Sequence, residues 1–74
     1  MKIKVVLYNE NDQEFETLFE SEVHYVPKKN EAMSFYLPDE RFCGNPLWAK
    51  VRRVTHCFNK NNEFTHIEVE LKQF

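Results

Sequence analysis

The strongest constraint on the fold is a pair of segments near the C-terminus in which apolar and polar residues alternate. In THIEVELKQF, at residues 65–74, every second residue from Ile67 to Leu71 is apolar. A period of two places these side chains on one face, which predicts a half-buried β-strand. The segment LWAKVRRVTHCF, at residues 47–58, alternates in the same way until Arg52 and Arg53 stand side by side. We interpret this interruption as a β-bulge, which adds one residue and bends the strand.

Apolar and charged side chains together predict how these two strands pair. If Val54 lies opposite Val69, then Val51 lies opposite Leu71 and the two adjacent arginines together oppose Glu70. Shifting the pairing by one residue would set apolar side chains against charged ones. The first register is therefore favoured.

The N-terminal half of the chain contains further strand candidates. Residues 2–8 place Ile3, Val5 and Leu7 on one side and two lysines on the other, and the turn-forming cluster NEND follows at residues 9–12. Residues 33–37 form a short alternating run that Pro38 ends, because proline has no N–H for the ladder. Gly44 is the only glycine, and we expect it at a turn that needs a positive φ.

Residues 14–25 admit two interpretations. As a strand, they present apolar or small residues on one face from Phe15 to Tyr25 and glutamates on the other, with Leu18 as an exception. As a helix over residues 14–23, they would be capped by Asp12 and carry an apolar stripe that includes Leu18. We favour the strand because the face is long and the turn before it suits a hairpin.

A chain of 74 residues forms one domain, residues 1–74, and one small core. We expect an all-β fold of about five antiparallel strands that curl into a small barrel with a bulged fourth strand. This pattern resembles the SH3-like small barrels of uncharacterised bacterial and phage-encoded proteins, which implies a fold and no settled activity. The resemblance rests on Val26, Pro27, Phe35, residues 48–54 and residues 67–71. The chain departs from it at Asn30, where such proteins often have glycine, although asparagine also tolerates positive φ.

The sequence gives little support to metal binding or catalysis. In the predicted register Cys57 and His66 are cross-strand neighbours, while His56 points to the core. Structural zinc sites use four ligands with close spacings, and neither these residues nor His24 and Cys43 supply them. A catalytic thiol also needs a base, an orienting group and a pocket. We therefore expect no metal, no cofactor, no catalytic residue and no enzymatic activity.

Nucleic-acid binding is the second functional hypothesis. Small barrels bind single strands by combining basic residues with stacking aromatic rings. Lys50, Arg52 and Arg53 lie near Trp48 in the sequence. Neighbouring glutamates would neutralise the arginines, so the alternative is a set of charge pairs on a solvated face. Further basic residues of the flanking loops are Lys28, Lys29 and Arg41.

The favoured hypothesis is contact with a protein or peptide, as an interaction module or a subunit of a larger assembly. The exposed aromatic residues Tyr8, Tyr36 and Trp48 would form the contact surface, although they could instead cover the barrel ends. Nearby acidic residues, which suit a basic or proline-containing partner, are Glu14, Glu16, Glu20 and Glu22.

No apolar run reaches membrane-spanning length and no signal peptide is evident, so we expect a cytoplasmic protein without membrane contact. The oligomeric state is left open.

Overall fold

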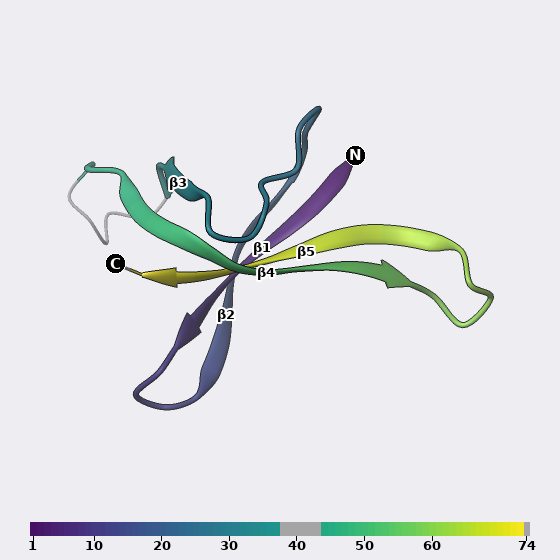
Figure 1. Ribbon diagram of the computed structural model, residues 1–74, viewed down its shortest axis with the longest axis horizontal. Helices are drawn as coiled ribbons and strands as arrows, with labels where there is room; N and C mark the ends of the chain where they lie inside the picture. Colours follow the sequence, from purple (N-terminus) through teal and green to yellow (C-terminus); the bar gives the residue numbers. More distant parts are fainter. Residues whose placement is uncertain (38–43, 74) are drawn as a thin grey trace.

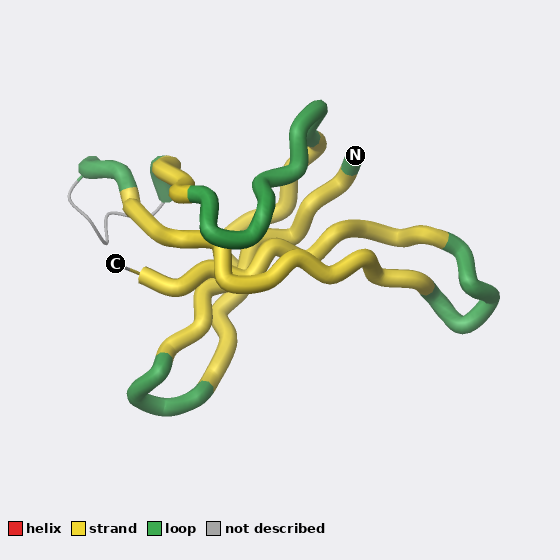
Figure 2. The backbone as a smooth tube through the Cα atoms, viewed as in Figure 1, coloured by secondary structure: helices red, strands yellow, loops and turns green. Residues whose placement is uncertain are grey.

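The structure, a computed structural model, describes residues 1–37 and 44–73, and within these ranges its regular elements are all strands (Figures 1 and 2). They form one five-stranded sheet in the order β2-β1-β5-β4-β3. The all-β prediction is therefore confirmed, and residues 14–22 are strand rather than helix. The strands are β1 (Lys2–Asn9), β2 (Glu14–Glu22), β3 (Ala32–Phe35), β4 (Leu47–Phe58) and β5 (Phe64–Gln73).

The sheet is mixed, so the prediction of purely antiparallel strands is wrong. β1 and β5 run parallel, from Ile3 opposite Ile67 to Tyr8 opposite Lys72. The other neighbours are antiparallel. Parallel strands need a long crossover connection, and the strands between β1 and β5 in the chain provide it. No described residue belongs to a helix that is long and apolar enough to cross a membrane.

The bulge in β4 and the register of the last hairpin are confirmed. Val54 lies opposite Val69 and Val51 opposite Leu71, while Arg52 is the extra residue beside the Arg53–Glu70 pair. Val51 is fully buried although both neighbouring arginines are exposed. The bulge thus keeps apolar side chains in the core on both sides of an additional charged residue.

A second bulge, in β2, changes which side chains face the core. Val5 lies opposite Phe19 but Val6 lies opposite Thr17, so Leu18 is the extra residue. The prediction of one continuous face from Phe15 to Tyr25 is therefore wrong. The bulge turns Phe15 and Thr17 to the outer face, whereas Phe19 packs against the core. The strand also ends earlier than predicted, although Val23 still exchanges backbone hydrogen bonds with Met1.

The core lies on the inner face of the three central strands, and the sheet curls around it. Phe19 of β2 and Phe35 of β3 contact each other with ring centroids 5.1 Å apart. Because β2 and β3 are the two edge strands, this contact brings the open sides of a half-barrel together. Figure 1 shows the strongly twisted strands crossing near the centre of the molecule. The buried cluster consists of Ile3, Val5, Ala49, Val51, Ile67, Val69 and Leu71.

The β4–β5 hairpin extends past the core as a two-stranded arm (Figure 1). At its tip Phe58 and Phe64 pack edge to face and remain exposed. His56 lies opposite buried Ile67 but is itself exposed, so its predicted core position is wrong.

Two turn predictions are confirmed by the backbone angles. Gly44 has a φ of 79° and Asn30 a φ of 75°, both in the left-handed region. The turn around Asn30 is fastened by Glu31, which accepts hydrogen bonds from the Tyr25 hydroxyl and the Lys28 N–H. Three residues named in the sequence hypotheses lie outside the described ranges: Pro38, Arg41 and Cys43.

Candidate functional site

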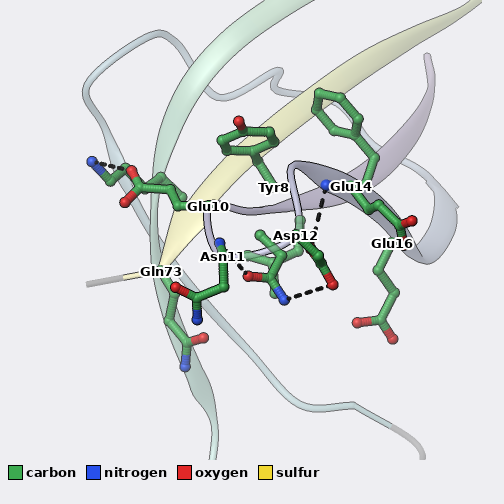
Figure 3. Close-up of a pocket in the computed structure, with 11 residues that line it drawn as sticks. Tyr8, Glu10, Asn11, Asp12, Glu14, Glu16 and Gln73 are labelled. Atoms are coloured by element: carbon green, nitrogen blue, oxygen red, sulfur yellow. Dashed lines mark hydrogen bonds and ion pairs between the residues drawn. The ribbon is translucent and has the colours of Figure 1, made fainter.

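A surface hollow of about 540 Å³ lies beside the turn that joins β1 to β2 (Figure 3). The turn, the adjoining ends of both strands and the end of β5 form its walls. It is lined by Leu7, Tyr8, Asn9, Glu10, Asn11, Asp12, Glu14, Phe15, Glu16, Lys72 and Gln73.

Side-chain hydrogen bonds give the turn a defined shape. The Asn9 Oδ1 accepts the Asn11 N–H at 3.0 Å, and the Asp12 Oδ1 accepts the Glu14 N–H at 3.3 Å. Gln13 takes a positive φ of 56° to reverse the chain. Asn and Asp favour such turns because their short side chains bond to nearby backbone N–H groups. The sequence NEND therefore sets the backbone from which the acidic side chains project.

Two aromatic rings form one wall of the hollow. Tyr8 and Phe15 are cross-strand partners, and their ring centroids lie 5.1 Å apart. Phe15 remains 54% exposed, which is a large apolar surface left to solvent. On the other side, the Arg52 guanidinium lies 4.2 Å from the Tyr8 ring centroid. Tyr8 is thus held between a cation and an aromatic ring, while Phe15 is open to a ligand.

The rim of the hollow is acidic. Among the described residues, four carboxylates and one lysine line it. That lysine, Lys72, binds the Glu10 carboxylate at 2.7 Å, and this contact lowers the pKa of Glu10. Figure 3 shows Glu10 on one side of the turn and Glu16 on the other, with Asp12 between them. The carboxylates outnumber the lysine among these described lining residues, which favours cationic side chains.

A second hollow, of about 450 Å³, lies next to the first and carries the opposite charge. Lys72 and Gln73 line both hollows. Lys50 and Lys72 are direct cross-strand partners, although like charges placed opposite each other destabilise a sheet. The lining residues are Lys29, Asn30, Lys50, Val51, Arg52, Lys72 and Gln73.

Arg52 also neutralises a buried carboxylate. Its Nε lies 3.3 Å from Oε2 of Glu70, whose side chain is only 7% exposed. The contact is an ion pair without hydrogen-bond geometry, so among the described residues this buried oxygen has no hydrogen-bond partner. Arg52 of β4 therefore contacts β5 through Glu70 and β1 through Tyr8. These contacts make its guanidinium less available to a ligand than its exposed fraction suggests.

The structure brings together some of the predicted binding residues and separates others. Tyr8, Lys50 and Arg52 share the outer face, where Lys72 lies between Tyr8 and Lys50. Trp48 is 58% exposed on the same face of β4 as Lys50, but its cross-strand partner is Ser34 of β3. Tyr36 is 71% exposed and follows the end of β3. Arg53 is exposed in the bulge.

The predicted neighbours Cys57 and His66 are confirmed as cross-strand partners. The structure adds Glu68, whose carboxylate completes a cluster with their side chains on the outer face of the arm. Sequence reasoning did not include Glu68 in a metal site. His24 is exposed and does not join this cluster.

Sequence reasoning also missed Phe15, Lys72 and Gln73 as residues of the candidate site. Phe15 was assigned to the core face, and only the bulge at Leu18 brings it to the outer face. The adjacent apolar residues Leu18 and Phe19 interrupt the alternation of β2, much as the two arginines interrupt β4. That interruption was the available signal.

Comparison of the chain with protein-family models, curated proteins and solved structures found no match.

Proposed function

We propose that this chain is a non-enzymatic β-sheet interaction module, or a subunit of a larger assembly, that contacts a protein or peptide partner. The observation that carries the proposal is the acidic hollow of the β1–β2 turn with its exposed ring of Phe15. A lysine or arginine side chain of the partner would enter this hollow.

The physical basis is the combination of an aromatic face with surrounding carboxylates. An aromatic ring attracts a cation above its face by about 0.5–1 kcal/mol at an exposed site. Nearby carboxylates add charge-assisted hydrogen bonds, which are stronger than those between neutral groups. The exposed rings of Phe58 and Phe64 at the tip of the arm offer a separate apolar contact for a larger assembly.

A kinship with SH3-like small barrels is supported by the bulged β4 and the curled sheet. SH3-type domains bind peptides with aromatic grooves and acidic loops, which agrees with the character of this hollow. We also propose a cytoplasmic, bacterial-type protein.

Peptide titration followed by amide chemical shifts tests the proposal. A panel of lysine- and arginine-containing peptides, with and without proline, should shift amide signals of residues 8–16 in at least one case. Phe15→Ala and Glu14→Gln should each weaken that binding several-fold. Glu20→Gln is the matched control, because it removes the same charge from β2 outside the lining of the hollow. If basic peptides shift no signals around the turn, or if the three variants behave alike, the proposal is wrong.

The second hollow supports nucleic-acid binding as an alternative function. Lys29 and Lys50 line it together with Arg52 and Lys72, and Trp48 is exposed nearby on β4. Titration with single-stranded oligonucleotides at several salt concentrations tests this alternative. Nucleic-acid binding should weaken steeply with salt, and Lys50→Gln should reduce the slope of log K against log salt by roughly 0.7. Shifts at the basic hollow with oligonucleotide, and none at the acidic hollow with peptide, would favour the alternative.

A further inference from the structure

On the outer face of the β4–β5 arm, three side chains of metal-binding type lie together. Cys57, His66 and Glu68 each offer one ligand atom, and these atoms all lie within 4.8 Å of one another. The register explains the grouping: Cys57 is the cross-strand partner of His66, and Glu68 follows His66 by two residues on the same face. All three side chains are half-buried.

Hydrogen bonds of the Thr65 hydroxyl orient the His66 imidazole so that it can bind a cation. The Thr65 hydroxyl lies 3.1 Å from the Cys57 carbonyl, which can only accept, and 3.0 Å from Nδ1 of His66. The single hydroxyl proton of Thr65 goes to the carbonyl, so the hydroxyl oxygen accepts from Nδ1–H. This arrangement favours the tautomer with the proton on Nδ1, in which Nε2 keeps the lone pair that a metal needs. Metal-bound histidines are commonly oriented by such a second hydrogen bond.

We propose that Cys57, His66 and Glu68 bind one divalent transition-metal ion of the zinc class. Structural zinc sites use four protein ligands, which is why the sequence alone predicts no metal. Sites with an open position use three ligands and leave the fourth to water. The site is distinct from the hollows proposed for peptide and nucleic acid, because none of its residues lines either of them.

The ligand set and the spacing agree with this class of ion. Thiolate and imidazole ligands select zinc-like ions over Mg²⁺ and Ca²⁺, which prefer oxygen ligands. Zinc–ligand bonds of about 2.0–2.3 Å in a tetrahedral arrangement place ligand atoms roughly 3.3–3.8 Å apart. Side-chain movements of about 1 Å would bring atoms within 4.8 Å to these separations. Lys4 of β1 lies opposite Glu68 in the register.

The test uses the full chain carrying Cys43→Ser, so that Cys57 is the only thiol. Zn²⁺ titrated by calorimetry should bind at one ion per chain and raise the unfolding midpoint, whereas Mg²⁺ should do neither. Co²⁺ should give a thiolate-to-metal absorption band, which Cys57→Ser abolishes. Glu68→Gln should weaken Zn²⁺ binding at least tenfold, and Thr65→Val should weaken it by roughly 10–100-fold through loss of the orienting hydrogen bond.

Control measurements separate this site from general zinc binding. His24→Gln removes an exposed histidine that does not belong to the cluster and should leave the affinity unchanged. Far-ultraviolet circular dichroism of each variant confirms that the sheet is retained. The proposal is overturned if Zn²⁺ does not bind, if Cys57→Ser keeps the affinity and the cobalt band, or if one ion joins two chains.

Discussion

Replacing Arg52 and replacing Arg53 should have different effects on stability, although the two residues are adjacent and chemically identical. Arg52→Ala removes the guanidinium that lies 3.3 Å from the Glu70 carboxylate and 4.2 Å from the Tyr8 ring. Arg53→Ala removes an exposed residue of the same bulge. Both substitutions keep the residue count and change the net charge equally, so each serves as the control for the other.

The magnitude follows from the burial of Glu70. Breaking a buried ion pair costs about 3–5 kcal/mol because one charge remains buried without compensation. The Glu70 side chain is 7% exposed but that of Arg52 is 40% exposed, so water will reach part of the vacated space. With the lost contact to Tyr8, we expect Arg52→Ala to lower the free energy of unfolding by about 2–4 kcal/mol. Arg53→Ala should cost about 0–1 kcal/mol.

Urea unfolding followed by circular dichroism measures both values. The whole domain should have a stability of about 4–11 kcal/mol, so the loss for Arg52→Ala is a large fraction of it. The double variant Arg52→Ala/Glu70→Met should be more stable than Arg52→Ala alone, because it also removes the buried charge. Equal midpoints for the two single variants, or a double variant less stable than Arg52→Ala, would refute the role given to the Arg52–Glu70 pair.

Three further predictions concern closure, pH and backbone strain. Phe19→Ala removes one ring of the contact across the open side of the half-barrel, and since this ring is only partly buried we expect a loss of about 2–3 kcal/mol in urea unfolding. Hydrogen bonds from Tyr25 and then from the Lys28 N–H lower the pKa of Glu31 below 4.5, so its stabilising contribution is present above about pH 4.5 and is lost as the pH falls through the folded pKa. Glu31→Gln should therefore flatten the fall in the thermal midpoint between neutral pH and pH 3. Gly44→Ala meets no steric obstacle but must adopt a φ of 79°, so it should cost about 1 kcal/mol, measured as a lower urea midpoint.

The register of the last hairpin could be predicted because both faces of its strands carry information. Apolar pairs such as Val54 and Val69 specify the inner face, and the arginines opposite Glu70 specify the outer one. A shifted register would have failed on both faces at once. The positive φ of Gly44 could also be predicted, because glycine adopts that backbone region without strain.

Strand direction could not be predicted in the same way. The alternation of β1 shows which side chains are buried, but a parallel and an antiparallel neighbour bury the same face. Ile3, Val5 and Leu7 pack beside β5 in the parallel direction. The connection that permits this direction runs through most of the chain, so short-range patterns contain no record of it.

The candidate site was predicted only in part for a related reason. Tyr8 was predicted as a binding residue with Glu14 and Glu16 nearby, but Glu10 was not included and Phe15 was assigned to the core. The position of Phe15 depends on the bulge at Leu18. The extra residue there places the preceding side chains of β2 on the opposite face of the sheet from the one that simple alternation predicts. Because this bulge was not recognised in the sequence, an aromatic ring of the proposed binding surface was predicted to lie in the core.

Lys72 gives the sharpest distinction between the two proposed ligands, because it lies between hollows of opposite charge. It pairs with Glu10 on the acidic side and lies opposite Lys50 on the basic side. Lys72→Gln should strengthen binding of a basic peptide by about 2–5-fold, which corresponds to roughly 0.5–1 kcal/mol for one exposed charge. The same substitution should weaken oligonucleotide binding and reduce the salt slope, since one phosphate contact is lost. Titrating this variant with both ligands distinguishes the hypotheses, because the affinity should rise for the peptide and fall for the oligonucleotide. If neither affinity changes, the functional surface lies elsewhere on the molecule.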